Sequence, residues 1–197
     1  MKKLTVLLLT MAMSFSMIAC GNNNDNGGQS TEQSPSQSVE QSVPEKTVYD
    51  VAMEDVRQAV VDALGENYWP QMAIPAEFLE GFGLTADLYE EFFGEMPMIS
   101  TNVDTLIVVK AKEDKIEEVE KALNAYRDNL VNDTMQYPMN LGKIQASEVK
   151  TFGNYVCFVQ LGADVMAALE KGDEEVIKHC QAQNAIAIEA LENVITK

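Results

Sequence analysis

The chain has 197 residues, 46% of them hydrophobic, and its 31 acidic against 14 basic side chains give a formal net charge of −17 at pH 7. Such a chain is a poor partner for nucleic acid or for anionic lipid headgroups, because affinity for either depends on clustered positive charge. The acidic surface either keeps the protein soluble or collects cations and basic peptides. Charge alone does not separate these two uses.

The first 19 residues have the layout of a cleavable secretion signal. Lys2 and Lys3 form a short positive stretch, and an uncharged, largely apolar segment follows from Leu4 to Ala19. This segment is shorter than the about twenty apolar residues that a membrane-spanning helix needs, and we expect residues 1–19 to be removed. The alternative is an ordinary signal, or an N-terminal membrane helix, that happens to end in a cysteine.

The end of this segment, Met17-Ile18-Ala19-Cys20, resembles a bacterial lipobox, in which the cysteine receives a diacylglyceryl group. The resemblance implies that Cys20 is lipidated and becomes the first residue of the mature protein. Several acyl chains attach a protein to a membrane stably, whereas one chain binds only marginally. We therefore expect a protein that its Cys20 lipid anchors to the extracytoplasmic face of the cell membrane.

A polar stretch follows the cysteine. Residues 21–46 are rich in Asn, Gly, Ser and Gln, with Val39 and Val43 as their only large apolar residues. Such a composition cannot bury enough apolar surface to offset the entropy of ordering, so we expect residues 20–46 to be a flexible tether, about 25 to 30 Å in typical reach. Residues 47–197 then form a single extracytoplasmic domain, a usual size for one core.

The first part of this domain is predicted to be largely helical. A helix is expected after Asp50, with apolar residues at helical spacing as far as Leu64 and with Gly65 as its stop signal. The aromatic and proline-rich passage 68–83 is predicted to mix loop with short helix. Residues 85–93 are predicted to form another short helix.

Strands are predicted next, at 97–101 and 105–111, with a turn at 102–104 between them. The second strand contains the uninterrupted apolar run that is typical of a well-buried strand. A long amphipathic helix is predicted from about Ile116 to Leu130, because apolar residues recur there at intervals of three and four. This helix should pack on the sheet with its apolar side.

The last part of the chain is predicted to form a hairpin and two helices. The hairpin strands are 145–152 and 155–161, with a turn at Gly153-Asn154, and the helices are 164–169 and 173–195. The resulting order, strand-strand-helix-strand-strand with flanking helices, predicts an α+β fold. We expect a small antiparallel sheet of about four strands.

Two cysteines remain once Cys20 is acylated, and their separation fits no metal-ligand spacing. A disulfide between Cys157 and Cys180 is one alternative for an exported domain. We expect instead two separate buried thiols, because free cysteine behaves as a small core residue.

Common catalytic and metal-binding motifs are missing from the sequence. His179 is the only histidine, and it falls opposite the apolar stripe of the last helix, so we expect it to be exposed. Met96 and Met98 are thioethers that could bind Cu(I), but two strand positions on one side more commonly pack in a core. We therefore expect no metal and no cofactor.

Carboxylates leave one enzymatic alternative open, a cell-envelope hydrolase that uses two of them as acid and base. Glu90-Glu91 and Asp173-Glu174-Glu175 are expected to be helix-surface and helix-start charges instead. We expect a noncatalytic binding or interaction module.

Seven aromatic residues gather between positions 68 and 93 and are the one local excess in the domain. They either pack an irregular segment onto the sheet or line a groove for a peptide, a glycan or an apolar small molecule. A peptide, glycan or protein outside the cell is the partner that such a groove predicts. The seven are Tyr68, Trp69, Phe78, Phe82, Tyr89, Phe92 and Phe93.

Several short motifs occur together across most of Val48–Leu161. They are Met96-Pro97-Met98-Ile99-Ser100 leading into Asp104-Thr105-Leu106-Ile107-Val108-Val109-Lys110-Ala111, then Val119, Leu123 and Arg127, then Tyr137-Pro138, then Gly153-Asn154-Tyr155-Val156. This set resembles a family of short lipoproteins, mostly of clostridia and related Firmicutes, that is known only as a domain of unknown function. The resemblance implies an exported, lipid-anchored protein, and it brings no catalytic residues.

Overall fold

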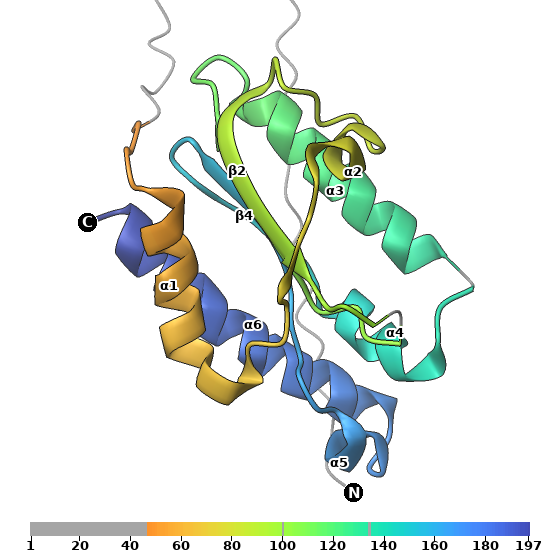
Figure 1. Ribbon diagram of the computed structural model, residues 1–197. Helices are drawn as coiled ribbons and strands as arrows, with labels where there is room; N and C mark the ends of the chain where they lie inside the picture. The colour runs from red at the N-terminus through yellow and green to blue at the C-terminus, as the bar shows by residue number, and fades with distance from the viewer. Residues whose placement is uncertain (1–46, 100, 134) are drawn as a thin grey trace, which may run out of the picture. The chain divides into compact units, whose positions relative to one another are not determined.

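In the computed structural model, which describes residues 47–99, 101–133 and 135–197, the chain folds around one antiparallel sheet (Figure 1). Its strands lie in the order β1-β2-β3-β5-β4, which places β3 and β5 inside the sheet. The strands are β1 (Met72–Ala73), β2 (Tyr89–Met96), β3 (Thr105–Ala111), β4 (Glu148–Phe152) and β5 (Tyr155–Gln160). The helices are α1 (Met53–Leu64), the 3-10 turn η1 (Gly65–Asn67), α2 (Ala76–Glu80), α3 (Ile116–Asn132), α4 (Pro138–Gln145), α5 (Met166–Leu169) and α6 (Asp173–Ile195).

The α+β class and the antiparallel sheet are confirmed. The predicted strand-strand-helix-strand-strand order corresponds to β2-β3-α3-β4-β5, but the first strand lies earlier than predicted and α4 stands between α3 and β4. The hairpin between β4 and β5 is confirmed as well, and Gly153 takes a positive φ of 59° in its turn. Such a conformation favours glycine, because a side chain would be strained there.

Helices cover both faces of the sheet (Figure 1). Successive side chains of a strand point to opposite faces, so Leu106 and Val108 of β3 pack against α1 and α6, whereas Ile107 and Val109 pack on the side of α2 and α3. Strand β5 is also buried at every position. This double burial explains why both strands have apolar runs in place of alternating patterns.

Helices α4 and α5 lie at one end of the sheet and pack against α6. Val176 and Cys180 of α6 form a small apolar cluster there with Ala146 and Val165. Within the described residues, no helix combines the length and the hydrophobicity that crossing a bilayer requires.

Two predictions around β2 are wrong. Residues 89–93 are strand and not helix, and residues 97–99 follow the strand instead of forming one. The pairing of β2 with β3 is irregular between Tyr89 and Glu91, and such a bulge disturbs the alternation by which a strand is recognised. Pro97 has no N–H for the ladder, and β2 ends just before it.

Because β2 lies earlier than predicted, the neighbouring methionines and glutamates also have other environments than those predicted for them. Met98 is 78% exposed and does not pack in the core, although Met96 packs partly against the α2–α3 side. Glu90 and Glu91 lie on β2 and not on a helix, and Glu90 forms an ion pair with Lys110 at 3.2 Å.

Helix α4 was not predicted, because residues 138–145 were assigned to a loop and to the start of a strand. Pro138 occupies its first turn, where a missing N–H has no effect on the helix. The short edge strand β1 is a further element that the sequence pattern does not reveal.

The cysteine prediction is confirmed, since Cys157 and Cys180 are both free and buried. The prediction for His179 is wrong, because its ring is partly buried and its Nε2–H donates to the Gly162 carbonyl at 2.9 Å. The chain between β5 and α5 therefore contacts α6 at His179. Cys20, the predicted signal and the predicted tether lie outside the described residues.

An aromatic cluster on the α3 side gives a test of this packing by pH. The Tyr126 ring stacks on Phe82 at 4.5 Å and meets the edge of Phe158 at 5.2 Å. Burial raises the pKa of Tyr126 from 10.0 to about 12. Its contribution to stability is therefore complete below pH 10 and is lost as the pH rises to about 12, by up to about 3 kcal/mol.

Urea unfolding between pH 8 and pH 12 should show this loss in the parent protein and a smaller loss in Tyr126→Phe, which keeps the ring but not the ionisable hydroxyl. Tyr137→Phe, at an exposed tyrosine, is the control and should follow the parent. Parallel curves for the parent and Tyr126→Phe would contradict the prediction.

Candidate binding site at the α4 end of the sheet

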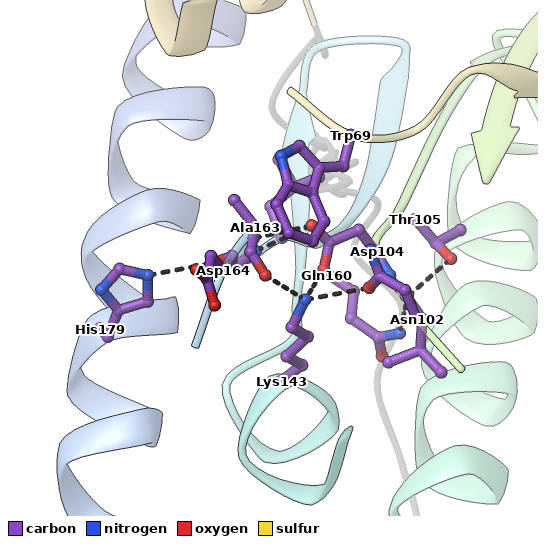
Figure 2. Close-up of polar contacts among 12 residues, drawn as sticks. Trp69, Asn102, Asp104, Thr105, Lys143, Gln160, Ala163, Asp164 and His179 are labelled. Carbon is purple, nitrogen blue, oxygen red and sulfur yellow. Dashed lines mark hydrogen bonds and ion pairs between the residues drawn. The ribbon is translucent and has the colours of Figure 1, made fainter. Parts of the chain in front are cut away.

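Polar residues from distant parts of the chain meet where β2 and β5 end and β3 begins (Figure 2). Thr105 pairs with Gln160 across β3 and β5, so the segments beyond these two residues leave the sheet side by side. Lys143 of α4 reaches between them, and its side chain is 3% exposed. A lysine is rarely buried this fully unless it is paired.

The Lys143 ammonium group has three donors, and each has an acceptor. Nζ donates to Asp104 Oδ1 at 2.7 Å, to Asn102 Oδ1 at 2.9 Å and to the Ala163 carbonyl at 2.7 Å. The three acceptors come from the β2–β3 connection and from the chain beyond β5. Lys143 thus joins α4 to both connections, and its donors are fully used.

Asp104 is the partner that balances the charge. Its carboxylate accepts from Lys143 and from the backbone amides of Ala163 at 2.8 Å and Gly162 at 3.4 Å. Burial raises the pKa of Asp104 above its ordinary value, although Lys143 and the two amides favour the ionised form. With its oxygens occupied by fixed donors, Asp104 acts as a structural anion in this site.

Trp69 closes the site on its outer side. Its ring lies over Lys143, with Nζ 5.4 Å from the ring centre, and Figure 2 shows the indole above the ammonium group. The indole N–H donates to the Glu66 carbonyl at 3.2 Å, which holds the ring while 38% of the residue stays exposed. Such a cation–π contact is worth more as the cation loses water.

Three pockets of about 340, 320 and 180 Å³ surround this polar centre. We call them the α3-side, middle and α4-side pockets, and together the three-pocket site. Ile99 and Asn102 line all three, so the pockets are neighbours around the β2–β3 connection. Lys143, which is buried and paired, and the exposed Asp164 are the charged residues among those that line them.

Methionine and isoleucine side chains make the rim of the three-pocket site apolar. Met98 is 78% exposed, Ile99 61% and Met166 56%, and Met72 and Met139 are also exposed. Apolar side chains gathered at one end of a domain mark a binding surface more often than isolated ones do. Methionine is flexible and polarizable, so such a surface can adapt to different apolar groups.

Two of the pockets are lined by a residue whose buried side-chain amide has an atom without a partner. In the α3-side pocket, Gln160 uses Nε2 to donate to the Val103 carbonyl, but Oε1 has no donor within the described residues. In the α4-side pocket, Asn140 Nδ2 likewise has no acceptor within the described residues. Both residues are only 1% exposed. Buried polar atoms are normally paired, so each is a position where a ligand could bond.

Comparison with known protein families gives one match. The family described as "Domain of unknown function (DUF4358)" matches residues 63–161, about half of the chain. The chain belongs to this family. No curated protein and no solved structure shows a significant match to it.

The DUF4358 match includes Trp69, Asn102, Asp104, Asn140 and Lys143, and it ends at Leu161, one residue after β5. The Ala163 carbonyl that completes the Lys143 contacts lies beyond the match, as do α5 and α6. The polar centre of this DUF4358 protein therefore combines the matched region with the segment that follows it.

The structure separates the seven predicted groove residues. Tyr68 and Phe93 pack on the α1–α6 side, where the Tyr68 hydroxyl donates to Glu95, whereas Phe78, Phe82, Tyr89 and Phe92 pack on the α2–α3 side. Trp69 and Phe78 are the two that line the three-pocket site. Six of the seven thus pack in the two cores, and one of these six, Phe78, also lines the site together with Trp69.

The residues that build the site were mostly missed by sequence reasoning. Lys143 and Asn140 were assigned to a loop, and Asp104 to a turn. A polar residue at the end of an apolar strand, such as Asp104 or Gln160, only weakly indicates a functional site. Nothing in the spacing of the residues indicates that Lys143 contacts Asp104. Within the described residues, no three His, Cys, Asp or Glu side chains are placed to hold a metal ion.

The Lys143–Asp104 pair predicts a coupling that can be measured. Loss of one partner leaves the other as an uncompensated buried charge, so Lys143→Met and Asp104→Asn should each lower the free energy of unfolding by about 3 to 5 kcal/mol. The double variant removes both charges and should lose less than the sum, by about 1 to 3 kcal/mol. Urea unfolding at pH 7 measures all four proteins, and additive losses would contradict the pairing.

Proposed function

We propose that this DUF4358 protein is a noncatalytic binding module that its Cys20 lipid anchors to the extracytoplasmic face of the cell membrane. The three-pocket site is where it binds apolar groups of a partner outside the cell. The observation that supports this most is the combination of an exposed apolar rim with two unpartnered buried amide atoms in its pockets. Buried polar atoms are normally paired, and two of the three unpartnered side-chain atoms among the described residues belong to residues that line these pockets, the third being Gln183 Oε1 on α6.

The hydrolase alternative requires two carboxylates that can reach one reacting group. Asp104 is engaged by Lys143 and two backbone amides. Asp164, the other carboxylate at the pockets, is exposed and accepts the Met166 amide at 2.9 Å. Neither is placed as a free general acid or base, which is why we favour binding.

Binding of apolar groups can be tested with N-phenyl-1-naphthylamine, a neutral probe that fluoresces in apolar surroundings. Trp69 is the only tryptophan and lies at the site, so energy transfer from it should report bound probe. Ile99→Glu places a charge among all three pockets and should weaken probe binding about tenfold or more, because a carboxylate resists transfer out of water.

The matched control is Ile186→Glu, at another exposed isoleucine, on α6, that lines none of the three pockets. It should bind the probe as the parent does. Equal affinity of the parent and Ile99→Glu would contradict the proposed site.

Anchoring is tested separately at Cys20. Cys20→Ala removes the thiol that would receive the lipid, so cells that express this variant should incorporate no labelled fatty acid into the protein and should release it or leave it unprocessed. Cys157→Ala is the control, because that thiol is buried in the sheet, and it should retain the label. Unchanged labelling in Cys20→Ala would contradict the anchor.

A further inference from the structure

We infer that the ligand of the three-pocket site is an extended polypeptide segment with apolar side chains and basic flanks. This inference rests on the proposed function and specifies the chemical class of the ligand. It is drawn from the polarity of the two unpartnered amide atoms, the shape of the apolar rim and the charge of the domain.

The two unpartnered atoms have opposite hydrogen-bonding roles. Gln160 Nε2 is bound to the Val103 carbonyl, so Gln160 Oε1 of the α3-side pocket needs a donor. In the orientation that the structure gives the Asn140 amide, Nδ2 of the α4-side pocket needs an acceptor. An acyl chain or another pure hydrocarbon offers neither. A polypeptide backbone offers both an N–H and a C=O at every residue, so one extended segment can satisfy both atoms.

The middle pocket connects the two positions. It shares Pro97 and Met98 with the α3-side pocket and Trp69 with the α4-side pocket. A segment that follows this path would place its backbone near Asn102 and its side chains against Met98, Ile99 and Met166. Flexible methionines accept different apolar side chains, which suits recognition of a class of sequences and not of a single one.

Charge favours basic flanks on the segment. Residues 47–197 contain 27 acidic and 11 basic side chains, and Lys143, which lines the α4-side pocket, is already balanced by Asp104. Asp164 is exposed at the rim, and the backbone carbonyl of the exposed Glu66 accepts the Trp69 indole N–H. Lysines on either side of the apolar stretch would therefore meet a negative surface, which accelerates association.

The experiment uses the full chain and measures displacement of N-phenyl-1-naphthylamine. The probe peptide is a capped nonapeptide with two lysines at each end and alternating valine and serine between them. Three further ligands are compared with it: the same peptide with glutamates in place of lysines, the lysine peptide N-methylated at its valines and serines, and dodecanol as a lipid-like compound.

The lysine peptide should displace the probe, and the glutamate peptide should need at least about tenfold more. N-methylation removes the backbone donors for Gln160 Oε1 and should also weaken displacement about tenfold. This comparison is made with the parent protein.

Asn140→Leu tests the other atom. It removes a donor that is unpartnered in the free protein, so the variant should unfold at the same or a higher temperature and bind the lysine peptide about tenfold more weakly. Ile186→Glu should match the parent in both measurements.

Unchanged peptide affinity in Asn140→Leu, or for the N-methylated peptide, would overturn the inference. Displacement by dodecanol but not by the lysine peptide would also overturn it, while leaving the proposed apolar site in place. If the parent does not bind the fluorescent probe at all, the proposed function fails as well.

Discussion

The buried ammonium group of Lys143 determines the arrangement of the α4 end of the domain. It donates to Asp104 and Asn102 in one connection and to the Ala163 carbonyl in another, and these acceptors are as many as 61 positions apart in the chain, from 102 to 163. An unpaired ammonium group in this position would be very costly to bury. We therefore expect the three acceptors and α4, which supplies the lysine, to assemble in one cooperative step. The walls of the pockets consist of the same segments. The ion pair therefore holds together the segments that line the candidate site.

The sheet supplies the frame on which this ion pair depends. Strands β3 and β5 are buried on both faces, so a shift of one residue in their pairing would move Leu106 and Ile107 to the wrong cores. Their fixed register places Thr105 opposite Gln160 and hence brings Asp104 close to Ala163. Close packing continues beyond the strands. A Cβ atom at Gly162 would lie 2.7 Å from Cys180 Sγ and 3.2 Å from the Lys143 side chain, so glycine is required for this approach.

Much of the fold follows from patterns that are local in the sequence. The apolar run of β3, the amphipathic pattern of α3 and the Gly153 turn each lie within one continuous stretch of at most 17 residues, and all three predictions are confirmed. The errors fall where local patterns conflict with distant contacts. The bulge between Tyr89 and Glu91 conceals β2, and Pro138 resembles a loop residue although it opens a helix. His179 is covered by a carbonyl 17 positions away, which no helical projection of α6 can show.

The site is harder to predict than the fold, for a physical reason. Its central contacts, Lys143 with Asp104 and Gln160 with Val103, join residues 39 and 57 positions apart, and neither pair forms part of a periodic pattern. Of the seven clustered aromatic residues, only Trp69 and Phe78 line the candidate site. The other five pack in the two cores. Compositional excess identifies contact area. It does not distinguish area that faces a core from area that faces a ligand.

The contrast between the ion pair and the two amides bears on function. Every donor of Lys143 is used, which shows that this end of the domain can satisfy buried polar groups well. Yet Gln160 Oε1 and Asn140 Nδ2, which belong to the same site, have no partners. Each costs the free protein about 1 to 3 kcal/mol of stability. An apolar residue of similar shape at Asn140 would avoid that cost. A domain that keeps the amide gives up stability in its free state, and that free energy is recovered when a ligand supplies the missing bond. Two kinds of buried polar group thus occur at this site: those of the ion pair are bonded within the chain, and the unpartnered ones belong to Gln160 and Asn140, which line the pockets.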